Sequence, residues 1–144
     1  MSFKSVIFVS IQFACIGLLM LTGTFIYLKS VFLTVEILGV ILGFWAILAV
    51  GPKHLSAFPE VNARSVLRTN GPYRLIRHPM YSSVLLVTLA WAANSLSMFR
   101  SIAWIILLID LLLKLSHEER LLAMSFPEYV SYQAKTARLL PFIY

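Results

Sequence analysis

The sequence predicts an all-α fold, a polytopic membrane helical bundle of about four transmembrane helices with a C-terminal cytoplasmic amphipathic helix. Two observations predict it. Hydrophobic residues make up 60% of the 144 residues and charged residues only 12%, a composition outside the usual range of soluble domains. In addition, the apolar residues gather in long runs and the prolines lie outside these runs. We therefore expect residues 1–144 to form a single integral membrane domain.

The first two elements are apolar runs at about residues 5–28 and 31–50. Each is close to the roughly 20 residues that a helix needs to cross the hydrocarbon core. The first run is too long for the apolar region of a signal peptide, and no small-residue cleavage site precedes Tyr27, so we expect it to be retained. Residues 1–50 are therefore predicted to supply two transmembrane helices.

A polar and basic segment follows at residues 51–80. Pro52, Pro59 and Pro72 prevent one continuous helix there, and Asn70-Gly71 adds a turn signal. We predict a structured cytoplasmic loop at the membrane surface.

Apolar sequence resumes at about residues 81–96 and 102–115, which predicts a helical hairpin over 81–115. An arm of about 15 residues rises roughly 22 Å, less than the roughly 30 Å of the hydrocarbon core. The polar end of the second arm is therefore expected close to the membrane surface. Residues 116–144 are predicted to form a cytoplasmic tail, helical to about Thr136 with a break at Pro127.

The basic residues predict the orientation. Ten of the twelve Lys and Arg residues fall on one side of the predicted membrane, and only Lys29 and Arg100 fall on the other. The positive-inside rule then places both termini and the long loop in the cytoplasm. The net charge of +6 suits contact with anionic membrane lipid, and no segment resembles a nucleic-acid-binding module.

Polar residues recur along the second arm of the hairpin. Asp110, Lys114, His117 and Glu118 are spaced i, i+4, i+7 and i+8, which places them on one helix face. We expect this face to point into the bundle. The alternative is an Asp110–Lys114 ion pair that only neutralises two charges, with Glu118 and Glu119 as ordinary solvated residues.

The loop carries a second polar group at its C-terminal end. One interpretation treats Arg68, Arg74 and Arg77 as topology signals only. It accounts less well for His78 and Tyr81, which lie three residues apart at the start of the predicted third helix and can face one cavity.

These two groups carry a resemblance to a known family. The run 71–81, GPYRLIRHPMY, is followed about forty residues later by EERLL at 118–122, and then by Phe126, Tyr129, Tyr132, Arg138 and Pro141. This order and spacing resemble the isoprenylcysteine carboxyl methyltransferase family, which is related to the membrane phospholipid methyltransferases. The resemblance covers about residues 65–141, whereas the first two helices match only in being hydrophobic.

The resemblance implies an integral membrane enzyme that moves a methyl group from S-adenosylmethionine to a lipophilic acceptor, such as an isoprenylcysteine-like carboxylate. The cofactor-binding residues that it implies are Ser65, Val66, Leu67, Arg68, Tyr73, His78, Pro79, Met80, Tyr81 and Glu118. Glu119 joins them, because the donor's sulfonium and ammonium groups need acidic partners. Tyrosine rings can add cation–π contact.

Lys114 and Arg77 are the candidate catalytic residues, because either can orient an anionic group of the acceptor. The family has an arginine where this chain has Lys114, and lysine cannot grip a carboxylate with two parallel hydrogen bonds. A prenylcysteine carboxylate is therefore a less secure acceptor here. The tail is expected to act as a lid on the cofactor site, or else to lie on the membrane as an amphipathic helix.

Two other functions fit the composition. A phospholipid N-methyltransferase uses the same donor. A non-enzymatic membrane protein, either a transporter subunit or an assembly factor, would use Glu36, Asp110 and Lys114 as a polar path through the bundle. Gly39 and Gly43 form a GxxxG pattern, a weak signal for a dimer.

Overall fold

The computed structural model describes residues 3–23, 29–51 and 67–141, and its elements in these ranges are helical. The predicted all-α fold is thereby confirmed. The elements in chain order are α1 (Phe3–Thr22), α2 (Ser30–Val50), the short 3-10 helix η2 (Gly71–Arg74), α3 (Pro79–Asn94), α4 (Met98–Ser125) and α5 (Tyr129–Gln133).

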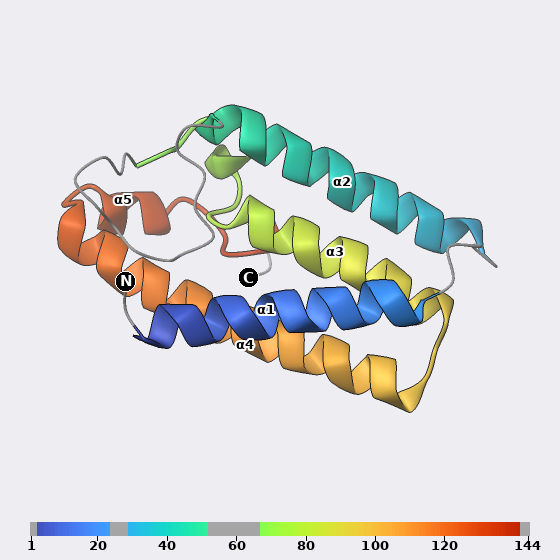
Figure 1. The fold of residues 1–144 in the computed structure, drawn as a ribbon. Helices are drawn as coiled ribbons and strands as arrows, with labels where there is room; N and C mark the ends of the chain where they lie inside the picture. The colour runs from blue at the N-terminus through green and yellow to red at the C-terminus, as the bar shows by residue number, and fades with distance from the viewer. Residues whose placement is uncertain (1–2, 24–28, 52–66, 142–144) are drawn as a thin grey trace.

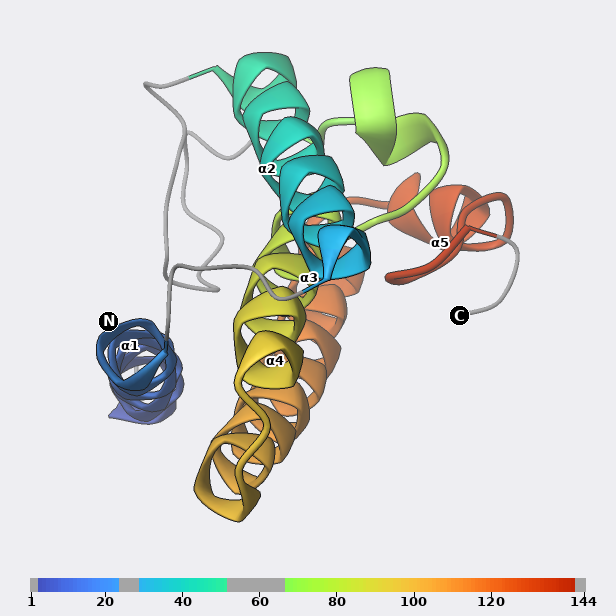
Figure 2. The ribbon, with the colours of Figure 1, turned by 90° about the vertical axis from the view of Figure 1, so that its right-hand side faces the viewer.

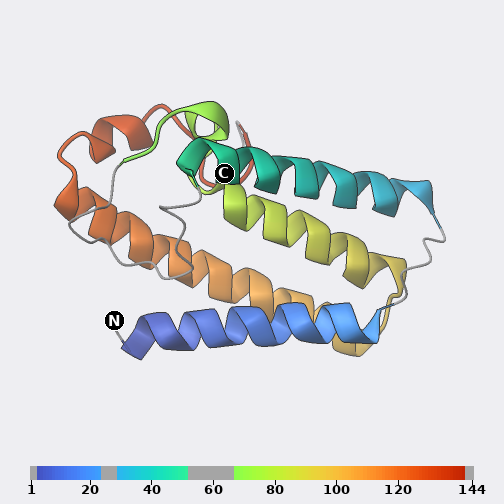
Figure 3. The same cartoon turned by 45° about the horizontal axis from the view of Figure 1, so that its top comes forward.

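Each of the four long helices runs antiparallel to the one before it in the chain (Figure 1). Helix α3 packs against both α2 and α4, and α1 packs mainly on α4. In Figure 2, α1 lies beside α4 at the left and α2 lies above α3. One end of the bundle gathers η2, α5, the start of α3 and the end of α4 (Figure 3). Residues far apart in the sequence therefore meet at this end.

Two helices, α1 and α2, are long and apolar enough to cross a membrane. In α2 the only buried residues are Gly39 and Ala46, and most of its large apolar side chains are exposed, as lipid-facing side chains are. Helix α3 has 16 residues, which rise about 24 Å. Helix α4 carries Arg100, Asp110 and Lys114 within its apolar part. Both therefore fall short of a plain membrane span, and the predicted number of four spans is not confirmed.

The end of the fourth helix differs from the prediction. The sequence predicted that the hairpin arm ends near residue 115 and that a separate tail helix follows. The structure has one helix of 28 residues, Met98–Ser125, because residues 116–125 include no glycine or proline to interrupt it. Helix α4 ends before Pro127, which disfavours a helical conformation in the preceding residue, so the predicted break is confirmed.

The GxxxG pattern is used within the chain. A Cβ atom on Gly43 would clash with Oγ of Ser83, and one on Gly39 would lie 2.9 Å from a methyl group of Val87. Ser83 also donates a hydrogen bond to the carbonyl of Gly39 at 2.7 Å. The two glycines therefore let α2 approach α3 closely, and they give no evidence for a dimer.

The core lies between α1, α3 and α4. Its buried members include Cys15, Leu19, Leu107 and Leu111, which confirms that Cys15 is a small buried apolar residue. At the end of the bundle away from η2, the buried side chain of Arg100 donates to the carbonyl of Trp91 and to Oγ1 of Thr22, which ties the ends of α1, α3 and α4 together.

Candidate functional site

The C-terminal tail docks beside the segment that precedes α3. The amide of Arg77 donates to the carbonyl of Ala137 at 2.8 Å, and the amide of His78 donates to the carbonyl of Arg138 at 3.1 Å. In return, the amide of Ala137 donates to the carbonyl of Leu75 at 3.1 Å. These bonds form a short parallel bridge between Ile76 and Ala137. They bring two segments about sixty residues apart into contact.

Glu119 is the centre of the side-chain cluster. Its Oε1 lies 2.6 Å from Nε of Arg77 and 3.4 Å from Nε2 of His78, and its Oε2 lies 3.1 Å from Nε of Arg138. The side chain of Glu119 is only 5% exposed. Burial alone raises the pKa of a carboxyl group, but the close contacts with His78 and Arg77 outweigh it and lower the pKa of Glu119 to about 2. Glu119 is therefore a buried anion held by cationic side chains.

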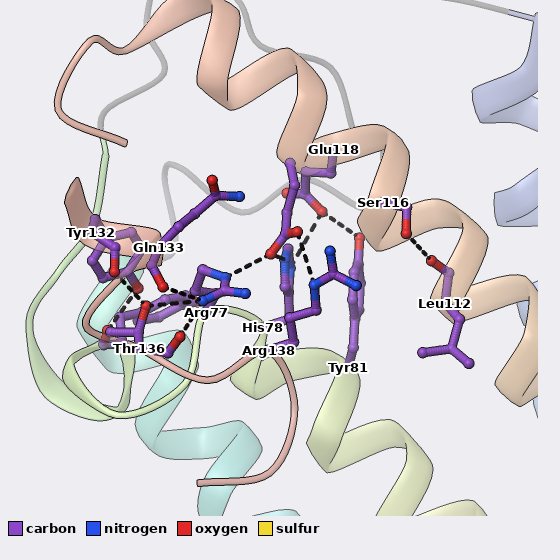
Figure 4. Close-up of polar contacts among 12 residues, drawn as sticks. Arg77, His78, Tyr81, Leu112, Ser116, Glu118, Tyr132, Gln133, Thr136 and Arg138 are labelled. Atoms are coloured by element: carbon purple, nitrogen blue, oxygen red, sulfur yellow. Dashed lines mark hydrogen bonds and ion pairs between the residues drawn. The ribbon is translucent and has the colours of Figure 1, made fainter. Parts of the chain in front are cut away.

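Arg77 also forms hydrogen bonds with the C-terminal tail. Its Nη1 donates to the carbonyl of Gln133 at 3.0 Å and to the carbonyl of Thr136, as Figure 4 shows. The Arg77 side chain is 9% exposed. One guanidinium therefore joins the end of α4 to the last residue of α5 and the turn that follows it, and most of its donor capacity is used inside the protein.

Glu118 is the more open of the two acids, with a side chain that is 29% exposed. Its Oε2 accepts a hydrogen bond of 2.7 Å from the hydroxyl of Tyr81 and lies 3.8 Å from Nδ1 of His78 (Figure 4). The rings of His78 and Tyr81 stack with centroids 5.3 Å apart. Nε2 of His78 is buried and makes no well-aligned hydrogen bond among the described residues. Its nearest charged neighbour is Oε1 of Glu119, at 3.4 Å.

Two tyrosines line the junction between the loop and the tail. The hydroxyl of Tyr132 donates to the carbonyl of Tyr73 at 2.6 Å. Burial, together with the charge of Glu118 and the neighbouring Tyr132, raises the pKa of Tyr73. Burial also raises the pKa of Tyr132 to about 12, with Arg77 opposing the rise and Glu119 adding to it. Both phenols are therefore neutral near pH 7 and act as hydrogen-bond donors or aromatic surface.

Lys114 lies deeper in the bundle and contacts two other helices. Its Nζ donates a 2.6 Å hydrogen bond to Oε1 of Gln12 on α1 and lies 5.2 Å from the centre of the Tyr81 ring on α3. The predicted alternative of a direct Asp110–Lys114 ion pair is not found among the described residues, although the two charges still attract each other. Lys114 instead joins α1, α3 and α4.

The structure brings together most of the residues that the sequence singled out. Arg77, His78 and Tyr81 meet Glu118 and Glu119 in the cluster described above. The other candidates differ in their placement. Pro79 is buried as the first residue of α3, Met80 beside it is half-buried, Leu67 and Arg68 are half-buried ahead of η2, and Ser65 and Val66 lie outside the described residues.

The sequence placed His117 and Glu118 on one face of the fourth helix, but in the structure they contact different helices. Glu118 turns toward Tyr81 on α3, whereas the His117 ring lies 6.4 Å from the ring of Phe8 on α1. Sequence reasoning missed Gln12 as the partner of Lys114, although an amide in an apolar run is itself a signal in a membrane helix. It also gave Arg138 no role in the site.

Comparison with known proteins adds no identification. No protein-family model matches the chain, and no curated protein matches it. The resemblance to the methyltransferase family therefore depends on the motif residues themselves.

Proposed function

We propose that this protein is an integral membrane methyltransferase that uses S-adenosylmethionine and acts on a lipophilic acceptor. One observation carries the proposal. The motif segments at 71–81 and 118–122 are far apart in the sequence, yet His78 and Tyr81 contact Glu118 at one end of a bundle with two membrane-length helices. A donor site built from both motifs requires this contact.

The side chains of the cluster fit the donor in charge. S-adenosylmethionine carries a sulfonium cation, an ammonium, a carboxylate and ribose hydroxyls. The cluster offers the partly exposed carboxylate of Glu118 and the imidazole of His78 beside it. The rings of Tyr73 and Tyr81 add aromatic surface, which attracts a sulfonium or stacks on adenine. These groups supply both the anionic and the hydrogen-bonding partners that the donor needs.

The two glutamates take different roles in this proposal. Glu118 receives a positive group of the donor, because its Oε2 contacts Tyr81 and His78 while its side chain is partly exposed. Glu119 is already surrounded by cations, so it holds the site together. Leu67, Arg68, Pro79 and Met80 complete the cradle, with Ser65 and Val66, as the family resemblance implies.

S-adenosylmethionine, when bound, supplies an electrophilic methyl group. The protein's own contribution is to orient the acceptor and to keep water away from the reacting groups. Lys114 lies one helical turn from Glu118 toward the bundle interior, so it orients an anionic group of an acceptor that arrives from the bilayer. Arg77 is the second candidate, and its contacts with Glu119 and the tail make it the less available of the two.

The decisive experiment is calorimetric titration of the purified protein with S-adenosylhomocysteine. We expect saturable binding, lost in Glu118→Gln and in His78→Ala and retained in the exposed control Glu128→Gln. Absence of heat from folded protein, confirmed by equilibrium dialysis with labelled ligand, would refute the donor site. Radiolabelled methyl transfer into a total lipid extract would then identify the acceptor and separate a carboxyl from an N-methyltransferase.

We also propose that α3 and the first part of α4 cross the membrane with α1 and α2, and that both termini are cytoplasmic. The even number of crossings agrees with the alternating helix directions in Figure 1. In a Cys15→Ala background, a membrane-impermeant maleimide should label Ser97→Cys in intact cells but Glu128→Cys only after permeabilisation. Labelling of both positions from the same side would overturn this topology.

The transporter alternative requires a continuous polar path through Glu36, Asp110 and Lys114, and the contacts of these residues do not support one. Glu36 accepts a hydrogen bond of 3.0 Å from the indole of Trp91 between α2 and α3, whereas Lys114 bonds Gln12 between α1 and α4. Helices α2 and α4 pack on opposite sides of α3 (Figure 2). Solute flux in liposomes, together with no affinity for the methyl donor, would nevertheless favour this alternative over the enzyme.

A further inference from the structure

Three large apolar side chains are exposed at the end of the bundle that carries the candidate site. Leu75 directly after η2 is 49% exposed, Met124 near the end of α4 is 77% exposed, and Val130 in α5 is 63% exposed. These segments also enclose the ionic cluster around Glu119, so they are not apolar membrane spans. Because apolar surface is unfavourable in water, its exposure on three neighbouring segments points to a contact outside the protein.

The packing of η2 against α2 fixes the level of this end relative to a membrane. Helix α2 has 21 residues, which rise about 31 Å, close to the thickness of the hydrocarbon core. A Cβ atom on Gly71 in η2 would lie 3.3 Å from Nε1 of Trp45 and 3.0 Å from Cβ of Ala49. These two residues belong to the last turn and a half of α2. When α2 spans the hydrocarbon, η2 therefore lies at the level of the lipid head groups, where tryptophan is also common.

Helix α5 and the tail lie at the same level as η2. The hydroxyl of Tyr132 in α5 donates to the carbonyl of Tyr73 in η2 at 2.6 Å, and the amide of Arg77 donates to the carbonyl of Ala137 at 2.8 Å. In Figure 2, η2 and α5 lie to the right of α3 and α4, on the side away from α1. These segments therefore stand beside the bundle, where the head groups of neighbouring lipids would be.

Basic side chains accompany the exposed apolar ones. Arg74 adjoins Leu75 in the sequence, and Arg120 lies one helical turn from Met124 on the exposed face of α4. Lys135, directly after α5, is exposed as well. Segments that bind to a membrane surface combine apolar side chains, which enter the boundary of the acyl chains, with basic side chains, which attract anionic lipid.

We propose that these segments form a surface that binds anionic phospholipid at the head-group level of the leaflet. Its residues are Arg74, Leu75, Arg120, Met124, Val130 and Lys135. The three apolar side chains enter the acyl boundary, and the three cations bind lipid phosphate groups. The tail makes its part of this contact, through Val130 and Lys135, while it is docked beside η2. Anionic lipid therefore favours the docked tail, whatever reaction the site performs.

A fluorescent label tests the depth of this surface. In a Cys15→Ala background, Val130→Cys is labelled with the polarity-sensitive dye NBD and reconstituted into liposomes of phosphatidylcholine and phosphatidylglycerol. We expect quenching by lipids that carry a nitroxide on the head group. Val40→Cys, at an exposed position in the middle of α2, is the depth reference and should be quenched by a nitroxide deep in the acyl chain. Emission typical of water at position 130, without quenching by either lipid, would overturn the proposal.

Hydrogen exchange in nanodiscs tests the preference for anionic lipid. The amides of His78 and Ala137 form hydrogen bonds between the loop and the tail, so their protection reports docking. We expect about fivefold slower exchange when phosphatidylglycerol is added to phosphatidylcholine, the effect of one basic residue at an anionic surface. The difference should disappear in Lys135→Gln and at high salt. It should persist in the matched control Lys29→Gln, an exposed lysine at the opposite end of α2.

The outcomes are distinct from those of the donor experiment. Equal protection of the tail in the two lipid mixtures, or the same lipid dependence in Lys135→Gln as in Lys29→Gln, would overturn binding of anionic lipid by this surface. All the substituted side chains are exposed, so the variants should fold. Because neither measurement uses a methyl donor, a failed titration with S-adenosylhomocysteine would count against the enzyme and leave the lipid-binding surface standing.

Discussion

The substitution Glu119→Gln tests how the site is held together. It keeps the size of the side chain and removes its charge, so Arg77 and His78 lose the buried anion between them. The fold lowers the pKa of Glu119 from an ordinary 4.5 to about 2, which corresponds to about 3 kcal/mol in favour of the ionised form. Breaking a buried ion pair by removing one partner costs a similar amount, about 3–5 kcal/mol. We therefore expect docking of the tail to weaken by about 3 kcal/mol.

Hydrogen exchange followed by mass spectrometry measures this loss locally. The amides of Arg77, His78 and Ala137 form the backbone bonds between the loop and the tail. Their exchange through local opening should accelerate about 100-fold, since each 1.4 kcal/mol is a factor of ten. The helices α1 and α2 should exchange as before. Unchanged protection at these amides, or the same change in the exposed control Glu128→Gln, would refute the role of Glu119 as the centre of the cluster.

Three further results are expected. Because the folded pKa of Glu119 lies below its unfolded value, its stabilisation is complete above about pH 4.5 and is lost as the pH falls toward 2, so protection of the tail amides should decrease over that range and not between pH 6 and 8. Tyr81→Phe removes the hydroxyl donor to Glu118 and should weaken S-adenosylhomocysteine binding about five- to tenfold with little change in thermal stability; unchanged affinity would contradict a ligand role for this pair. Gly43→Ala places a Cβ in clash with the Ser83 hydroxyl on α3 and should cost about 1–3 kcal/mol, whereas Gly17→Ala, with no atom within 4 Å, should not lower the melting temperature.

Much of the fold follows from local patterns. The apolar runs at about 5–28 and 31–50 correspond to α1 and α2, and the run at 81–96 corresponds to α3. Proline also acts locally, so the end of α4 before Pro127 was predictable. The boundary near residue 115 was wrong because a change from apolar to polar residues marks a change of surroundings, and a helix continues through it when no residue interrupts the backbone.

The sequence predicted which residues belong to the site, but it did not predict which of them contact each other. The spacing of His78 and Tyr81, and of Glu118 and Glu119, indicated two polar groups, but it did not indicate which acid would be enclosed. The structure places Glu119 among cations and leaves Glu118 partly exposed. Adjacent residues on a helix point about 100° apart, so which one faces the tail depends on the rotation of α4 within the bundle.

The sequence by itself determined the helical class, the apolar lengths and the residues able to carry charge near the membrane, because these depend on composition and on short-range spacing. Only the tertiary structure decided that Lys114 bonds Gln12 instead of Asp110, and that the glycines of α2 pack against α3. Such contacts join helices separated by many residues, and they depend on the direction and rotation of each helix after packing, which no short stretch of sequence specifies.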